Sequence, residues 1–145
     1  MARPTQVDPR SMRVAAAFTT VVLALVLVTP PRVSIALLIA QTAVFAIGAL
    51  VSLKASPYSI VFARFVRPRI GPPAELEDAR PPQFAQAVGL AFAVLALLGI
   101  GLGAPELGFV AVAFALVAAL LNASIGLCLG CELYLALHRL RLVRA

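Results

Sequence analysis

Four uncharged apolar stretches follow one another along the chain, separated by polar or proline-containing segments. They run from Val14 to Thr29, Val33 to Leu53, Phe84 to Gly103 and Leu107 to Cys131. A bilayer core takes about 20 apolar residues as a helix, with a range of roughly 17 to 25. The first stretch is short for this purpose but carries no charge. The pattern predicts four transmembrane helices, at approximately residues 14–29, 33–53, 84–103 and 107–131.

Two of the connections are too short for anything but a tight turn between antiparallel helices. They read Pro30-Pro31-Arg32 and Ala104-Pro105-Glu106, and such turns join neighbouring helices into hairpins. The sequence therefore predicts an all-α integral membrane protein, a single membrane domain over residues 1–145 built from two helical hairpins. A cleaved signal peptide over Met1 to Thr29 is the alternative, but no small-x-small cleavage site follows the apolar run.

The central segment, residues 54–83, contains a second kind of pattern. Its first part reads SPYSIVFARFVR from Ser56 to Arg67. A serine followed by a proline is typical of a helix start. Apolar residues then recur at helical spacing, with Arg64 off their stripe; they are Tyr58, Val61, Phe62, Phe65 and Val66. This pattern predicts a short interfacial helix in the headgroup layer; a soluble loop packed under the bundle is the alternative.

Composition and charge narrow the class of protein. The chain is 62% hydrophobic and 12% charged, whereas soluble domains are about half apolar and a quarter charged. The bilayer is therefore the expected solvent and partner. The net charge of +6 does not indicate nucleic-acid binding, because the basic residues flank apolar runs instead of forming one patch. With one histidine and two cysteines, we expect no metal site, no disulfide scaffold and no cofactor.

Lysine and arginine are distributed unequally between the two sides of a four-helix topology. Eleven of the 12 basic residues lie before the first helix, in the central segment or in the tail over residues 132–145, and Arg32 alone lies on the other side. The positive-inside rule then places both termini and the central loop in the cytoplasm. We expect a multi-pass protein of the cytoplasmic membrane with its basic tail inside the cell.

The last apolar stretch ends in NASIGLCLGCELY, from Asn122 to Tyr134, which holds both cysteines. On a continuous helix, Asn122, Gly126 and Gly130 share one row, and the two glycines form a GxxxG pair that lets another helix approach closely. Cys128 and Cys131 fall on nearly the opposite side. The wheel thus predicts a packing seam, within the bundle or in a homo-oligomer, and a separate face that carries the thiols.

The CxxC spacing makes Cys128 and Cys131 a candidate redox pair, because residues i and i+3 are neighbours on a helix. Counting from Leu107 places them at the cytoplasmic boundary, where thiols are kept reduced, so two thiols are expected at rest. On this interpretation they lie at the C-terminal end of the helix. The helix dipole there opposes a thiolate, and so does Glu132.

Three segments of the chain resemble an uncharacterised, largely actinobacterial family of four-helix membrane proteins, a domain of unknown function. They are DPRSMRVAA, SPYSIVFARFVRPRIGPPAELEDARPPQFAQAVG and NASIGLCLGCELY. The resemblance implies an integral membrane protein with an NAxxGxCxGCExY signature, and no catalytic activity comes with it. It also implies a soluble thioredoxin-like or sulfurtransferase partner. The signature positions are Asn122, Gly126, Cys128, Gly130, Cys131, Glu132 and Tyr134.

Three functions stay open at this point. The first is thiol–disulfide or sulfur exchange through Cys128 and Cys131 with a soluble partner. The second is a structural or scaffolding membrane protein whose cysteines only pack. The third is a small-solute transporter, which the absence of acidic and basic residues from the four apolar stretches argues against.

Overall fold

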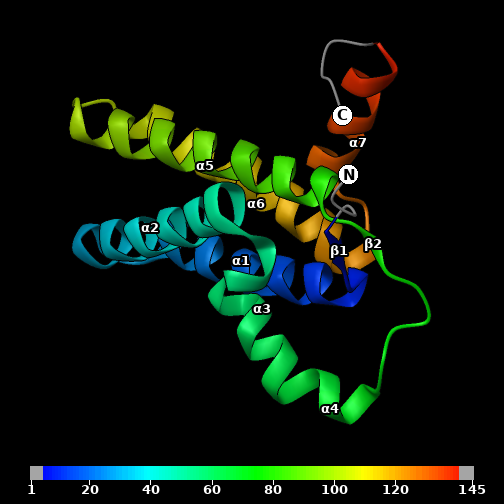
Figure 1. Ribbon diagram of the computed structural model, residues 1–145. Helices are drawn as coiled ribbons and strands as arrows, with labels where there is room; N and C mark the ends of the chain where they lie inside the picture. Colours follow the sequence, from blue (N-terminus) through cyan, green and yellow to red (C-terminus); the bar gives the residue numbers. More distant parts are fainter. Residues whose placement is uncertain (1–4, 141–145) are drawn as a thin grey trace.

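Four long helices form two hairpins, as the sequence predicts. The computed structural model describes residues 5–140. The first hairpin consists of α1 (Pro9–Val28) and α2 (Pro31–Ala46), which a π turn, η1 (Ile47–Val51), extends; the second consists of α5 (Arg80–Gly101) and α6 (Pro105–Ile125). All four are long and apolar enough to cross a membrane. Both hairpin turns lie at one end of the bundle, and the strands and the last helix lie at the other (Figure 1).

The four helices begin earlier than the apolar stretches predict. Each has a proline in its first turn: Pro9, Pro31, Pro81 or Pro105. Proline suits this position because the first backbone N–H groups of a helix have no intrahelical partner and its φ angle is already helical. The polar residues before each apolar stretch therefore belong to the helix, which the hydrophobic pattern alone does not reveal.

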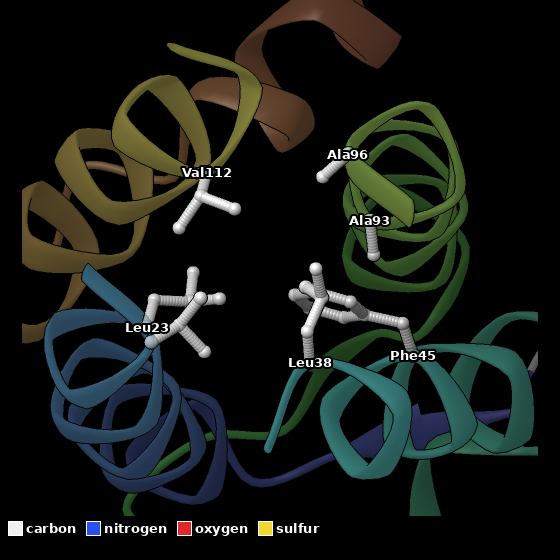
Figure 2. Close-up of a cluster of buried hydrophobic side chains, with 7 residues drawn as sticks. Leu23, Leu38, Phe45, Ala93, Ala96 and Val112 are labelled. Atoms are coloured by element: carbon white, nitrogen blue, oxygen red, sulfur yellow. The ribbon is translucent and has the colours of Figure 1, made fainter. Parts of the chain in front are cut away.

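The core lies between the four helices, and each helix contributes apolar side chains to it. α1 packs against α2 and α6, and α5 packs against the same two helices. The buried cluster points into the space between them (Figure 2); its members are Leu23, Val26, Leu38, Phe45, Ala93, Ala96 and Val112. The outer faces are apolar as well, and Val21 and Leu95, for example, are more than half exposed. Helices that are apolar all round are the expected form in lipid.

Polar side chains inside the bundle are bound to one another. Gln41 is 1% exposed; its amide donates to Thr19 Oγ1 at 3.4 Å and its carbonyl accepts from the Tyr58 hydroxyl at 2.6 Å. Ser34 donates to the Val26 carbonyl at 2.7 Å across the first hairpin. Because an unbound polar group is costly in an apolar medium, these bonds fix α2 against α1 and hold the segment that contains Tyr58.

The central segment is helical from residue 57 to residue 70. It consists of α3 (Pro57–Val61), a π turn, η3 (Phe62–Val66), and α4 (Arg67–Ile70), and a 3-10 turn, η2 (Leu53–Ala55), precedes it. Figure 1 shows α3 next to the bundle and α4 leading away from it. The helix ends at Gly71, whose φ of 75° terminates it.

The burial of this segment differs in detail from the predicted stripe. Phe62 is buried and Tyr58 is bound to Gln41, so these two face the bundle. Phe65, Ile60 and Ile70 are exposed, beside exposed arginines such as Arg64. Exposed apolar residues beside arginines are the composition that an interfacial helix requires, and the placement of this face in the headgroup layer stays a prediction.

A two-stranded ribbon, which the hydrophobic pattern does not predict, joins the starts of the two hairpins. β1 (Gln6–Val7) pairs antiparallel with β2 (Glu77–Asp78), with Gln6 opposite Asp78 and Val7 opposite Glu77. Each strand leads into an Asp-x-Arg unit at a helix start, Asp8 to Arg10 and Asp78 to Arg80. In both units the carboxylate accepts the arginine backbone N–H at 2.9 Å and forms an ion pair with its guanidinium.

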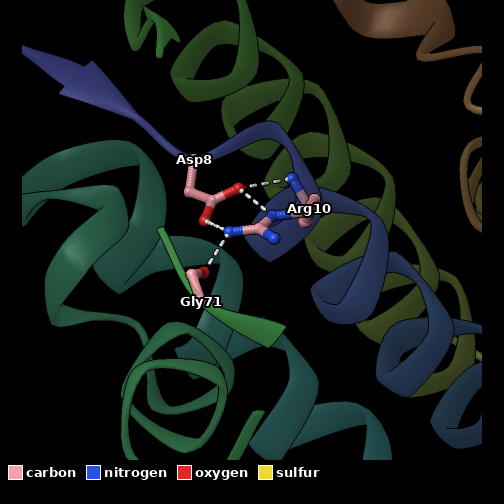
Figure 3. Close-up of polar contacts among 3 residues, drawn as sticks. All are labelled: Asp8, Arg10 and Gly71. Atoms are coloured by element: carbon pink, nitrogen blue, oxygen red, sulfur yellow. Dashed lines mark hydrogen bonds and ion pairs between the residues drawn. The ribbon is translucent and has the colours of Figure 1, made fainter. Parts of the chain in front are cut away.

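The first Asp-x-Arg unit also binds the end of α4. Arg10 donates to Asp8 Oδ2 at 2.9 Å and to the Gly71 carbonyl at 2.8 Å (Figure 3). The side-chain hydrogen bond from Arg10, followed by its backbone N–H and its charge, holds the pKa of Asp8 below its ordinary value, against the opposing effect of burial. Asp8 therefore stabilises the fold in its ionised form.

This lowered pKa predicts a loss of stability in acid. A carboxyl whose pKa is depressed in the folded state contributes stability above its unfolded pKa, near 4, and loses it as pH falls through the folded value. We expect Asp8→Asn to lower the free energy of unfolding by about 1 kcal/mol at pH 7, and the difference from wild type to shrink below about pH 4. Thermal unfolding in detergent micelles, followed by circular dichroism, measures this difference.

The second Asp-x-Arg unit supplies the matched control. Asp78 is more exposed than Asp8 and no bond from Arg80 to another segment accompanies its ion pair in the described residues. Asp78→Asn should therefore have the smaller effect at pH 7, since exposed pairs contribute little. A gap between wild type and Asp8→Asn that stays constant from neutral pH to pH 3 would refute the role assigned to Asp8.

Candidate cysteine site

The helix that carries the signature is broken, which corrects the predicted helix over residues 107–131. α6 ends at Ile125, Gly126 adopts a left-handed conformation with φ of 74°, and a separate helix, α7 (Leu129–Arg139), follows. The Gly126 N–H donates to the Asn122 carbonyl at 3.1 Å, as in an αL C-cap. Glycine terminates the helix here because it adopts this conformation without the steric cost that a Cβ atom brings.

Arg13 completes the cap of α6 from the start of α1. Its guanidinium donates to the Ala123 carbonyl at 3.4 Å and the Ser124 carbonyl at 3.1 Å. These carbonyls lie in the last turn of α6, where they have no intrahelical partner and carry the negative end of the helix dipole. In the sequence Arg13 is only one of the eleven basic residues that set the predicted topology, because no local pattern connects it with a residue so far along the chain.

Cys128 and Cys131 lie in the first turn of α7 and form a disulfide, with 5.2 Å between their Cα atoms. Cys128 is the N-cap, and its Sγ accepts the Cys131 backbone N–H at 3.2 Å. The predicted place at the C-terminal end of a helix is therefore wrong. The pair lies at a helix N-terminus, where the dipole favours negative charge. The structure shows the pair as a disulfide, and the expectation that it rests as two thiols in the cell stays a prediction.

α7 is held against the start of α5 by a close backbone approach and an aromatic contact. A Cβ atom on Gly130 would lie 2.6 Å from both Cα and Cβ of Ala85, so only glycine fits this contact. The Tyr134 ring lies 5.6 Å from the Phe84 ring, centroid to centroid. Gly130 thus marks a close helix contact, as the seam predicts, but Gly126 does not: it serves the turn.

A cleft of about 760 Å³ lies between α1, α5, α6 and α7, reaches Phe45 of α2, and has the disulfide in its wall. Six of the seven signature residues line it, namely Asn122, Gly126, Cys128, Gly130, Cys131 and Glu132, whereas Tyr134 packs on Phe84 outside it. The helical wheel had placed the glycine row and the thiols on opposite faces. The break at Gly126 brings them together, because residues on either side of it no longer share one helical axis.

Comparison with protein families adds a match over nearly the whole chain. The family described as domain of unknown function DUF4395 matches residues 7–139, which include all four apolar helices, the ribbon except Gln6, and the cysteine pair. The chain belongs to the DUF4395 family. This confirms the resemblance to a family of unknown function. No curated protein and no solved structure matches this DUF4395 chain.

Proposed function

We propose that this DUF4395 protein carries out thiol–disulfide or sulfur exchange with a soluble thioredoxin-like or sulfurtransferase partner through Cys128 and Cys131. The observation that carries the proposal is the position of the pair. Both cysteines lie in the first turn of α7, in the wall of an open cleft, and both are partly exposed. A pair that only packs would be expected in the buried core, among the residues of Figure 2.

The two sulfurs have different surroundings, which assigns them different roles. In the reduced form, a negative charge on Cys128 is stabilised by the Cys131 N–H and by the N-terminus of α7. Cys128 is therefore the attacking thiolate and Cys131 the resolving thiol. Attack on a partner disulfide forms a mixed disulfide on Cys128 and releases one partner thiolate; attack by Cys131 then releases the second and leaves the disulfide that the structure holds.

The distribution of charge favours exchange at the cytoplasmic face. The ribbon, the central segment and α7 lie at one end of the bundle (Figure 1), and this end holds the basic residues of the described chain except Arg32. By the positive-inside rule this end is cytoplasmic. α7 presents Leu129, Leu133 and Leu135 as exposed apolar residues beside the cysteines, which gives a soluble partner, or a second copy of the chain, an apolar contact.

The difference between the two thiols is testable with glutathione disulfide as the partner. Cys131→Ser and Cys128→Ser are prepared in phospholipid nanodiscs, reduced, and mixed with glutathione disulfide at pH 7. We expect Cys131→Ser to form its mixed disulfide roughly tenfold faster than Cys128→Ser, because only Cys128 occupies the N-cap. Mass spectrometry of quenched samples measures both rates, and the wild type should end as an intramolecular disulfide without glutathione.

The same variants distinguish exchange from packing. If both thiols stay unreacted while the protein remains folded, the cysteines only pack and the protein is a scaffold. If both react at the same rate, the role assigned to the N-cap is wrong. In cells, Cys131→Ser should hold a soluble thiol protein in a disulfide that reductant releases, and Cys128→Ser should hold less of it.

A further inference from the structure

The cleft extends from the cysteines into the part of the bundle that the bilayer surrounds. Beyond the cysteine end, its lining includes three phenyl rings, Phe45, Phe92 and Phe114, from three different helices. Phe114 lies in the middle of α6 and is 64% exposed. A residue that both lines the cleft and lies on the outer surface of a transmembrane helix places an opening of the cleft on the lipid side. The cleft is thus accessible from the bilayer.

Two side-chain amides line the cleft near its cysteine end, Gln86 on α5 and Asn122 on α6. Neither makes a side-chain hydrogen bond to any residue that the structure describes. By contrast Gln41, the other amide deep in the bundle, binds both Thr19 and Tyr58. Both side chains are half-buried, so Gln86 and Asn122 are available to donate hydrogen bonds to the oxygens of a ligand in the cleft.

We propose that the cleft binds a lipid-soluble quinone that accepts electrons from the reduced cysteine pair. The proposal rests on the proposed thiol function and names its electron acceptor. A quinone matches the three observations together: its ring packs on phenyl side chains, its two carbonyl oxygens accept hydrogen bonds from the amides, and its apolar tail reaches lipid past Phe114. Ligand cavities commonly measure about 300–1,000 Å³, and the volume of this one, about 760 Å³, suits a ring with part of its tail.

The reaction balances with the two sulfurs and one quinone. The two S–H bonds of reduced Cys128 and Cys131 break and one S–S bond forms. The two electrons pass to the quinone, and its two carbonyl oxygens each gain a proton, so that a hydroquinone leaves. The Cys128 proton reaches the quinone through solvent, because Cys128 reacts as a thiolate, and Cys131 supplies the other. The product is the Cys128–Cys131 disulfide. A soluble dithiol reduces it again by the reverse of the exchange given under the proposed function, so electrons run from the partner dithiol through the cysteine pair to the quinone.

The test measures hydroquinone formation by the reduced full chain in quinone-free phosphatidylcholine nanodiscs, with decylubiquinone as the probe. Ala118→Phe fills the cleft, whose wall includes Ala118. Val117→Phe is the matched control, because Val117 is the preceding residue on α6, is 53% exposed and lies outside the cleft. We expect Ala118→Phe to slow hydroquinone formation roughly tenfold or more, and Val117→Phe to match wild type. One disulfide should form per hydroquinone.

A second variant covers the case in which Ala118→Phe does not fold. Asn122→Ala removes one amide and adds no bulk, so we expect it to raise the KM for decylubiquinone several-fold without changing the rate with glutathione disulfide. Equal rates of hydroquinone formation in the wild type and both variants would overturn the proposal. So would a product in which the quinone is attached to a cysteine and no hydroquinone forms. If the wild type reacts with glutathione disulfide but not with the quinone, this inference alone fails. If it reacts with neither, the proposed function fails as well.

Discussion

Gly130→Leu separates α7 from the bundle and lowers the free energy of unfolding by about 1–3 kcal/mol or more. Even a methyl group at this position would lie 2.6 Å from the Ala85 backbone. That distance is well inside van der Waals contact, and backbone on a transmembrane helix has little freedom to move aside. The ring contact between Phe84 and Tyr134 is lost with it. Thermal unfolding in detergent micelles and limited proteolysis of the α7 segment both report the change.

Gly101→Leu is the control for bulk at a helical glycine. A Cβ atom on Gly101 would have no atom within 4 Å, so this variant should unfold at nearly the wild-type temperature and resist protease equally. If Gly130→Leu matches it in both measurements, α7 does not pack on α5 as the structure shows. That result would also refute the predicted role of Gly130 in a close helix contact.

Gly126→Val removes the turn that ends α6. Gly126 has a φ of 74°, which costs a residue with a Cβ atom about 1–2 kcal/mol and is worse for a β-branched one. We expect a loss of about 2 kcal/mol in the free energy of unfolding. Because the chain then favours continued helix, Cys128 no longer caps α7. Its reaction with glutathione disulfide, measured in the Cys131→Ser background, should slow toward the rate of an ordinary exposed thiol.

Gly126→Asn is the control at the same position, since asparagine tolerates the left-handed region. It should keep most of the stability and most of the Cys128 reactivity. Equal damage from valine and asparagine would mean that side-chain bulk, and not backbone conformation, matters at this site. That result would restore the packing seam in place of the turn.

The transmembrane architecture follows from the sequence because it depends on a property that single residues carry. An uninterrupted apolar stretch of bilayer length has few alternatives to a helix, and a three-residue connection forces a hairpin. Hydrophobicity alone does not, however, show where each helix starts. α5, with Pro81 in its first turn, and α1, which starts at Pro9, both begin in the polar residues before their apolar stretches. Backbone geometry, and not hydrophobicity, decides where a helix starts.

The sequence identifies the residues of the cysteine site, but it predicts one continuous helix where the structure has a break at Gly126. The GxxxG pair at Gly126 and Gly130 is compatible with a packing seam and with a helix end. A close helix contact needs a residue without a side chain, and so does the left-handed turn that ends a helix. Apolar residues continue through Leu127 and Leu129, so no change of pattern marks the break. Two contacts hold the broken helix in place, Arg13 to the Ser124 carbonyl and Gly130 to Ala85. Both join segments far apart in the chain, so no local pattern reveals them.

The ribbon was missed because two-residue strands have no periodicity to detect. A signal was nevertheless present in the repeated Asp-x-Arg unit, which occurs at Asp8 and at Asp78. An aspartate just before a helix and an arginine in its first turn are a local cap. Their recurrence before both hairpins indicates that the two hairpins begin in the same way at the same end of the bundle.

The pairing of β1 with β2 also sets an order on biosynthesis. The strand before the first hairpin, β1, pairs with β2, which lies just before the second hairpin. During synthesis Gln6 and Val7 therefore stay unpaired until α1, α2 and the central segment have been made. A chain halted after α2 has two inserted helices and an unpaired strand. Closure of the ribbon therefore requires β2 to have been made, and it ties the start of the second hairpin to the N-terminus.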